Sequence, residues 1–348
     1  MNEASATDEE PAKRPSVHQR VRRVLAVVLA ILAGVLLAFC VYEVSLQPGA
    51  AIVKTVFEAR PEVTPPADFS AVKRSVTPGR LVKVAAQGIP TADLTIYSPR
   101  HSSSALPIVL WIHGGGFISS SASTVEDYSI ILASHGYLVA SLDYSLAPGA
   151  RHPTPVLQAN AALALLDSRA AEYGADAAKI FIGGDSAGAQ IASELAAMQS
   201  NPDFADALNV HPALASGQLR GVVLFCGLYD MDTVAKTGFP ALRTYLWAYT
   251  GSRDWTSYRD IDQMSTTRTA TSAYPPTFLS VGNADPFQSQ ATELASHLRA
   301  KGVQVSTLWW QGSRSKLGHE YQFDFSRPQA RTALSATLDF IHSQEVLP

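Results

Sequence analysis

The hydrophobic positions of this chain fall into short continuous runs that alternate with longer segments of helical character. Apolar runs of about four to eight residues between turn signals are typical of strands buried on both faces of a sheet. The alternation predicts an α/β fold with a mostly parallel sheet and helices on both faces. The predicted strands are 81–86, 93–97, 108–112, 138–142, 179–183, 219–225, 277–281 and 304–310. The predicted helices are 125–134, 155–173, 189–199, 288–301 and 328–343.

The segment from about 231 to 273 breaks this rhythm. It holds the aromatic-rich stretch TYLWAYTGSRDWTSY and lies between two predicted strands, which is typical of a cap inserted into a sheet domain. The chain begins with a polar tail, followed by an apolar run and then a proline-containing segment without a clear period. We therefore expect a disordered basic tail at 1–23, an apolar segment at 24–44, a linker with a possible cap segment at 45–78 and the sheet domain at 79–348.

The apolar segment contains VLAVVLAILAGVLLAFCVY at 24–42, which carries no charge. As a helix this run would be about 28 Å long, close to the hydrocarbon thickness of a bilayer. By the positive-inside rule, the basic cluster before it predicts a single-pass membrane anchor with a cytoplasmic N-terminus and the sheet domain outside the cytoplasm. A cleaved signal peptide, or an apolar helix packed on the domain as part of a lid, would leave a similar pattern. The basic cluster consists of Lys13, Arg14, Arg20, Arg22 and Arg23.

Composition narrows the class of protein. Of the 348 residues, 47% are hydrophobic and 16% are charged, and the formal net charge is −3, which suits a globular protein with a large core. Since no basic patch is interleaved with aromatic residues, we expect no nucleic-acid partner. The two cysteines are Cys226 and Cys40, which lies inside the apolar run, so the sheet domain can form no internal disulfide.

One predicted strand runs into the sequence Gly184-Asp185-Ser186-Ala187-Gly188, and the helical stretch AQIASELAAMQ follows at once. A G-x-S-x-G sequence between a strand and a helix is typical of the nucleophile elbow of a serine hydrolase, in which a sharp turn exposes the serine above the sheet. We predict Ser186 as the nucleophile, with Gly184, Asp185 and Gly188 supporting the turn. A nucleotide-binding turn with an incidental serine is the weaker interpretation, because no Walker or dinucleotide fingerprint is present.

A second glycine-rich element, His113-Gly114-Gly115-Gly116, follows another predicted strand. A serine hydrolase needs N–H groups aimed at the oxyanion of its tetrahedral intermediate, and glycines let a carbonyl group approach such N–H groups closely. Together with the elbow, this element predicts an oxyanion hole formed by the N–H groups of Gly114, Gly115 and Ala187. His113 and Gly116 are expected to hold the loop in shape.

The general base is expected after the nucleophile in the chain, because the order Ser, acid, His is typical of serine hydrolases with a nucleophile elbow. Of the later histidines, His297 and His342 lie in predicted helices, and His211 precedes a proline in a loop. Only His319 follows a late strand, in the glycine-bounded loop QGSRSKLGHEY at the carboxyl edge of the predicted sheet. We predict His319 as the general base.

The acid that orients this base is expected in a loop between the two. Asp285 lies in GNADPF directly after the predicted strand 277–281, and it is our predicted acid. Asp230 also follows a predicted strand and stays open as the alternative. Glu320 is adjacent to the base and is therefore badly placed to orient it.

These motifs occur in the order HGGGF, DYSLAP, GDSAG, GNADPF and His319 from about residue 80 to the C-terminus. In this combination the chain resembles the hormone-sensitive lipase-like group of α/β-hydrolases. The resemblance implies an α/β-hydrolase fold with an eight-stranded sheet, a cap over the site and hydrolysis of carboxylic esters without a cofactor or a metal. Three features depart from the group. Ser145 stands where Arg is usual, and the loop before His319 is a few residues longer than usual. Glu320-Tyr321 replaces the frequent Gly-Phe after the base.

The sequence thus predicts a membrane-anchored serine carboxylesterase or lipase-like hydrolase that acts through a Ser-His-Asp triad and an acyl-enzyme. Its expected partners are a small-molecule or lipid ester and, through the N-terminal helix, the membrane. A deacetylase or amidase would use the same triad. A non-catalytic receptor on the same fold normally lacks the nucleophile or the base, whereas Ser186, Asp285 and His319 are all present here.

Overall fold

The computed structural model of the chain describes residues 17–44, 49–51, 54–55 and 63–345. The chain divides into two compact units, 1–49 and 50–348. The first contains helix α1 (Val17–Val44), and the second contains the β-sheet with the helices that pack on it. Most of the expected N-terminal tail and part of the expected linker lie outside the described residues.

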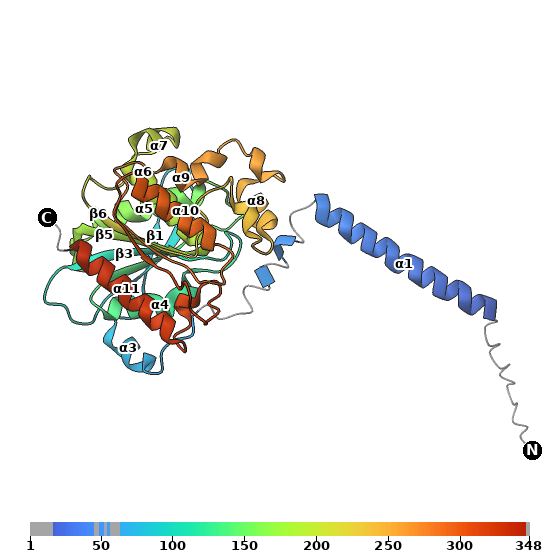
Figure 1. Ribbon diagram of the computed structural model, residues 1–348, viewed down its shortest axis with the longest axis horizontal. Coiled ribbons are helices and arrows are strands. Elements are labelled where there is room, and N and C mark those ends of the chain that lie inside the picture. Colours follow the sequence, from blue (N-terminus) through green and yellow to red (C-terminus); the bar gives the residue numbers. More distant parts are fainter. Residues whose placement is uncertain (1–16, 45–48, 52–53, 56–62, 346–348) are drawn as a thin grey trace, which may run out of the picture. The chain divides into compact units, whose positions relative to one another are not determined.

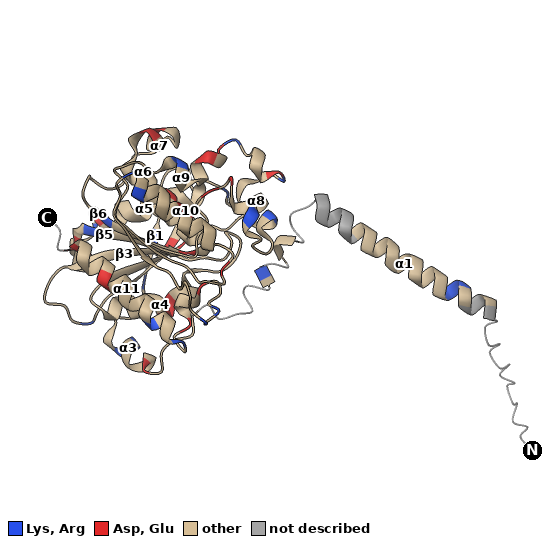
Figure 2. Ribbon diagram, in the orientation of Figure 1, with Lys and Arg blue, Asp and Glu red and all other residues tan. Residues whose placement is uncertain are grey.

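Helix α1 corrects the membrane prediction. In the part of the chain that the structure describes, no helix is long and apolar enough to cross a membrane. Figure 2 shows the basic residues of the described part of α1 near its N-terminal end, before the apolar stretch. The expected anchor at 24–44 is therefore wrong, and so is the location of the sheet domain that was inferred from it.

Eight strands form one sheet in the second unit (Figure 1). Their order is β1-β2-β4-β3-β5-β6-β7-β8; β2 runs antiparallel to β1 and β4, and the other neighbours are parallel. The predicted eight-stranded, mostly parallel sheet is confirmed. The strands are β1 (Arg80–Val84), β2 (Ala92–Tyr97), β3 (Leu106–Ile112), β4 (Leu138–Asp143), β5 (Ala175–Asp185), β6 (Leu219–Phe225), β7 (Thr277–Ser280) and β8 (Val305–Leu308).

Helices cover both faces of the sheet (Figure 1). Strand β3 is buried along its whole length, and this burial explains why its sequence is continuously apolar rather than alternating. One face is covered by α5 (Thr154–Ser168), α6 (Ser186–Ser200) and α10 (Gln288–Ala300), and the other by α4 (Glu126–Ser134) and α11 (Pro328–Glu345). A helix occurs at each of the five predicted places.

An aromatic cluster fills the core on the α4 and α11 side. Trp111 of β3 packs against Tyr128 of α4, Phe225 of β6 and Phe323, with ring centroids 4.9, 5.4 and 6.4 Å away. Edge-to-face and tilted aromatic pairs at such distances contribute about 0.5–1.5 kcal/mol each beyond their burial. The cluster therefore fixes the end of β3 and the indole of Trp111, which borders the site described below.

Short helices connect the remaining segments. Between β6 and β7, where a cap was expected, the chain forms η3 (Val234–Thr237), α8 (Leu242–Thr250), η4 (Trp255–Ser257), η5 (Ile261–Met264) and α9 (Thr266–Thr269). Elsewhere lie α3 (Phe69–Ser75), η1 (Ala122–Val125), η2 (Ala171–Tyr173), α7 (Pro202–Ala207) and η6 (Tyr321–Phe323). Since β3, β5, β7 and β8 are parallel, the loops that follow them meet at one edge of the sheet.

Candidate active site

Ser186 lies at the junction of β5 and α6, where the chain turns sharply. Its φ is +50°, a left-handed conformation that a residue other than glycine adopts only where its surroundings hold it there. Gly188 makes this turn possible, because a Cβ on that residue would lie 2.0 Å from the carbonyl oxygen of Ile112. The first turn of α6 therefore packs directly on the end of β3 and presents the Ser186 hydroxyl at the positive end of the helix.

The structure brings Ser186, His319 and Asp285 into one hydrogen-bonded chain. Nε2 of His319 lies 2.9 Å from the Ser186 hydroxyl oxygen. Nδ1 of the same ring lies 2.9 Å from Oδ2 of Asp285. Since a carboxylate accepts, Nδ1 carries the proton and Nε2 is the acceptor that faces the serine. This arrangement can take a proton from the serine hydroxyl.

The Asp285 carboxylate is held from two sides. Its Oδ1 accepts a hydrogen bond of 2.8 Å from the backbone N–H of Phe287, which leaves Oδ2 to His319. The Asp285 side chain is fully buried, while that of His319 is 19% exposed. The histidine is therefore the member of the pair that meets solvent, and the carboxylate is shielded behind it.

Two hydrogen bonds tie the loop after β7 to the loop after β8. The backbone N–H of Leu317 donates to Oδ1 of Asn283 at 2.9 Å, and the N–H of Ala284 donates to the Leu317 carbonyl oxygen at 2.8 Å. These bonds lie just before Asp285 and His319 in their respective loops. They fix the distance between the acid and the base.

Asp230, the alternative acid, does not take part in this chain. Its Oδ1 accepts hydrogen bonds from the backbone N–H groups of Asp232 and Thr233, and its Oδ2 accepts one from the Thr267 hydroxyl. The carboxylate therefore stabilises a local turn at the start of the segment between β6 and β7.

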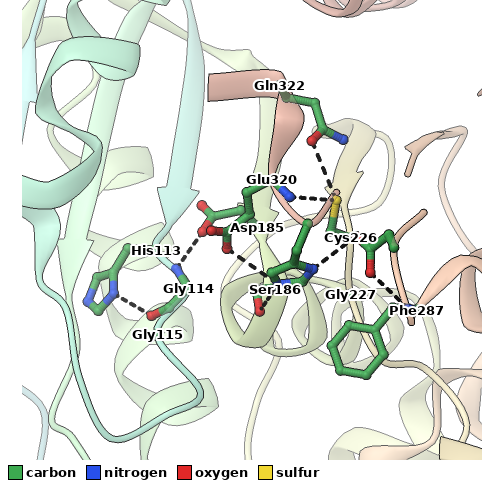
Figure 3. Close-up of polar contacts among 12 residues, drawn as sticks. His113, Gly114, Gly115, Asp185, Ser186, Cys226, Gly227, Phe287, Glu320 and Gln322 are labelled. Carbon is green, nitrogen blue, oxygen red and sulfur yellow. Dashed lines mark hydrogen bonds and ion pairs between the residues drawn. The ribbon is translucent and has the colours of Figure 1, made fainter. Parts of the chain in front are cut away.

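The loop after β3 corrects one predicted oxyanion donor. The N–H of Gly114 donates a 2.7 Å hydrogen bond to Oδ2 of Asp185 (Figure 3), and the indole N–H of Trp111 donates to Oδ1 at 2.9 Å. Since its N–H is already engaged, Gly114 is wrong as an oxyanion donor. The Asp185 carboxylate instead joins this loop to the nucleophile turn, and its supporting role in the site stays a prediction.

The N–H groups of Gly115, Gly116 and Ala187 find no acceptor among the described residues. Gly115 and Ala187 stay predicted oxyanion donors. Gly116, predicted as structural only, offers an N–H that could replace that of Gly114. The sequence could not separate these glycines, because the difference depends on where the Asp185 side chain points.

His113 supports the same loop through a hydrogen bond to its backbone. It is fully buried, its Nδ1–H donates a 2.9 Å hydrogen bond to the Gly114 carbonyl oxygen, and its ring stacks on Tyr144 at 4.3 Å. Burial lowers the pKa of His113 to about 4, against the opposing effect of the Gly114 carbonyl group. The imidazole is therefore neutral at pH 7.

A nearby departure from the resembled group also has a local explanation. Ser145 stands where an arginine is usual, and the fully buried Gln158 bonds to it twice. The amide oxygen of Gln158 accepts from the Ser145 N–H and its amide nitrogen donates to the Ser145 hydroxyl, each at 2.8 Å. The same nitrogen also donates to the Pro90 carbonyl oxygen. Neutral hydrogen bonds thus hold this turn without an arginine.

Two residues at the site escaped the sequence analysis. Glu320 was rejected as the acid of the triad, but its Oε1 lies 3.6 Å from Nε2 of His319. Cys226 is fully buried and offers its Sγ to the Glu320 N–H at 3.4 Å, while its thiol donates to Oε1 of Gln322 at 3.4 Å (Figure 3). The only signal in the sequence was the replacement of Gly-Phe after His319 by Glu-Tyr.

Cys226, Asp285 and His319 place metal-ligand atoms within 4.8 Å of one another. The aspartate and histidine atoms bond to each other, and burial raises the pKa of the Cys226 thiol well above its usual value. Metal binding would need a thiolate and would break the bond between acid and base. These three residues therefore fit a hydrogen-bonded support better than a metal site.

Comparison with known proteins gives one family match. A family model described as alpha/beta hydrolase fold matches residues 109–316. An acetyl esterase of Salmonella schwarzengrund (strain CVM19633) is 32% identical over 167 residues, which are 47% of this chain and 48% of that protein. An acetyl esterase of Salmonella typhi is 31% identical over the same shares. The chain thus aligns with about half the length of the curated relatives it matches.

Solved structures of esterases have a similar fold. Esterase B from Lactobacillus Rhamnosis (HN001) has a TM-score of 0.72 at 21% identity, covering 86% of this chain and 96% of that one. A thermostable carboxylesterase from a metagenomic library has a TM-score of 0.66 at 22% identity, covering 87% and 98%. At such identities the likeness shows the fold alone.

Proposed function

Because the chain belongs to the α/β-hydrolase family whose model matches residues 109–316, we propose that it is a serine carboxylesterase acting on small-molecule esters. The observation that carries the proposal is the hydrogen-bonded chain from Ser186 through His319 to Asp285, with 2.9 Å at each link. The acetyl esterases among its relatives support a short acyl group in the substrate.

The first half of the reaction forms an acyl-enzyme. The Ser186 oxygen attacks the ester carbonyl carbon while Nε2 of His319 takes the hydroxyl proton. Asp285 stabilises the resulting imidazolium through its bond to Nδ1. The tetrahedral oxyanion is stabilised by the N–H groups of Gly115, Gly116 and Ala187, and losing one such donor typically costs about 3 kcal/mol. The C–O bond then breaks, and the departing alkoxide takes the proton from Nε2.

The second half releases the acid. A water molecule gives a proton to Nε2 of His319 and attacks the acyl carbon of the ester on Ser186. The second tetrahedral intermediate collapses, the serine oxygen leaves and recovers the proton from Nε2, and the carboxylic acid departs. Both halves use the same base, and the proposed reaction needs no cofactor.

A fluorophosphonate probe tests the nucleophile. The probe should label the native protein and fail to label the Ser186→Ala and His319→Ala variants. Hydrolysis of 4-nitrophenyl acetate should fall by a factor of about 10³ or more in both variants, because the covalent route is lost. A series of 4-nitrophenyl esters should show faster turnover for short acyl chains, and an acetanilide tests for amidase activity. More than a tenth of native activity in Ser186→Ala would refute the assignment.

A further inference from the structure

Glu320 has an unusual backbone conformation for its residue type. Its φ is +57° and its ψ is +30°. These angles lie in the left-handed region, which residues other than glycine, asparagine and aspartate rarely adopt. Cys226 holds it there, because its buried Sγ accepts the Glu320 N–H while its thiol is bonded to Gln322. Cys226 itself has a φ of +52°. Two left-handed residues in contact thus fix the direction of the Glu320 side chain.

This conformation turns the Glu320 carboxylate towards the reacting groups. Its Oε1 lies 3.6 Å from Nε2 of His319, the nitrogen that also faces Ser186. A Cβ on Gly114 would lie 2.9 Å from the same oxygen, so the carboxylate lies against the loop after β3 as well. Figure 3 shows the Glu320 side chain extending towards Gly114. The side chain is only 19% exposed, which limits screening by solvent.

Aromatic rings border the same space. Phe239, which is half-buried, has its ring centroid 5.0 Å from that of the His319 imidazole, and Phe287 stacks behind it at 4.3 Å. Tyr245 of α8 lies against Gly116, since a Cβ there would be 2.5 Å from the tyrosine ring. A carboxylate beside aromatic rings is a favourable environment for an organic cation.

From this arrangement, and resting on the proposed esterase function, we propose that Glu320 is a specificity-determining residue that selects esters whose alcohol part carries an ammonium group. The departing alkoxide must take its proton from Nε2 of His319, so the alcohol oxygen lies within hydrogen-bond distance of that nitrogen. Glu320 borders the same nitrogen and therefore acts on the alcohol rather than on the distant end of the acyl group.

The charge of Glu320 explains why a cation is favoured. A carboxylate beside a departing alkoxide disfavours a neutral substrate, because the two negative charges repel in the transition state. An ammonium group two or three bonds from the ester oxygen offsets this repulsion. Even after a discount for partial exposure, one such charge pair changes kcat/KM by about tenfold.

Two isosteric esters isolate the effect of charge. Acetylcholine and 3,3-dimethylbutyl acetate have the same shape and differ in the positive charge of the nitrogen. The measured quantity is the ratio of their kcat/KM values, cation over neutral, in the full chain. We expect this ratio to fall about tenfold in both Glu320→Gln and Glu320→Gly. Glycine readily adopts the left-handed backbone of this position, so the second variant guards against an effect of misfolding. The ratio in the native protein should also fall as salt is added.

The matched control is Glu172→Gln, which removes a surface carboxylate paired with Arg80 at the opposite end of β5. That variant should keep the native ratio. Inhibition of 4-nitrophenyl acetate hydrolysis by tetramethylammonium gives a second readout, with an inhibition constant about tenfold higher in both Glu320 variants.

The outcomes separate this inference from the function on which it rests. An unchanged ratio and an unchanged inhibition constant in the Glu320 variants, with esters hydrolysed normally, would overturn the role of Glu320 alone. Absence of ester hydrolysis together with absence of Ser186 labelling in the native protein would overturn the esterase proposal itself.

Discussion

The Asp285 carboxylate accepts a 2.9 Å hydrogen bond from Nδ1 of His319, from a fully buried position behind the imidazole ring. This bond fixes the tautomer in which Nε2 is unprotonated, and it places a negative charge where the imidazolium of the proposed reaction would form. An amide at position 285 would keep the shape of the side chain but lose that charge.

Asp285→Asn is therefore expected to lower kcat by about 10³ to 10⁴, with little change in the thermal midpoint. Asp230→Asn should stay within about threefold of the native kcat, because the Asp230 carboxylate bonds to its own turn and to Thr267 rather than to His319. The measurement is 4-nitrophenyl acetate hydrolysis at saturating substrate. The opposite result, with Asp230→Asn inactive and Asp285→Asn active, would move the acid to the loop after β6.

A buried hydrogen-bonded pair between α6 and the loop before α5 supports the nucleophile helix. Oε1 of Glu194 lies 2.7 Å from Nε2 of His152, both side chains are fully buried, and Gln190 donates to the second glutamate oxygen. Removing one partner of such a pair leaves the other unsatisfied in the core. Glu194→Ala should lower the free energy of unfolding by about 3–5 kcal/mol in urea titrations, because His152 and Gln190 both lose their buried hydrogen-bond partner. The surface variant Glu172→Ala should change it by about 1 kcal/mol at most.

The sheet was predictable because its strands are buried on both faces. Strand β6 was placed at its observed ends, and β3 within two residues of them, from their apolar runs alone. Helix α8 was missed, because its place depends on packing between distant segments. Tyr249 of α8, for example, stacks on Phe117 of the loop after β3 at 3.9 Å. The hydrophobic pattern within one segment does not predict a contact with a distant segment.

The candidate site shows the same division. The motif and chain order pointed to Ser186 and His319, whose contact follows from parallel strands ending at one edge of the sheet. The choice of oxyanion donors and the inward turn of Glu320 depend on backbone angles and on the neighbours Asp185 and Cys226. These are properties of the folded loops. The membrane prediction, which rested on length and charge alone, is wrong because no helix in the described part of the chain is long and apolar enough to cross a membrane.

Stability should depend on pH through His113. Its pKa in the folded state is about 4, below the usual value of 6.5, because burial disfavours the charged form. As pH falls from about 7 towards 4, the unfolded chain therefore takes up a proton that the folded chain does not. The difference of about 2.5 units corresponds to a loss of about 3 kcal/mol at pH 4 relative to pH 7.

The comparison of native protein with His113→Gln isolates this contribution. Urea titrations at pH 7 and at pH 4 should show a smaller loss of unfolding free energy in the variant. His135 and His297, whose pKa values are also lowered by burial, remain in both proteins and cancel. Equal losses in the two proteins would show that His113 does not set the pH dependence.

Gly282 keeps the acid and base loops at their working distance. A Cβ at this position would lie 2.2 Å from the carbonyl oxygen of Leu317 and 2.5 Å from that of Gly318, both backbone atoms of the loop that carries His319. Gly282→Ala must therefore push the two loops apart, and a displacement of about 1 Å at a catalytic centre can cost about 10²-fold in rate.

Gly318→Ala is the matched control in the facing loop, since a Cβ there meets nothing within 4 Å. We expect kcat to fall about 100-fold in the first variant and less than about threefold in the second, with both folded by circular dichroism. Full activity in Gly282→Ala would mean that the contact between these loops does not set the geometry of Asp285 and His319.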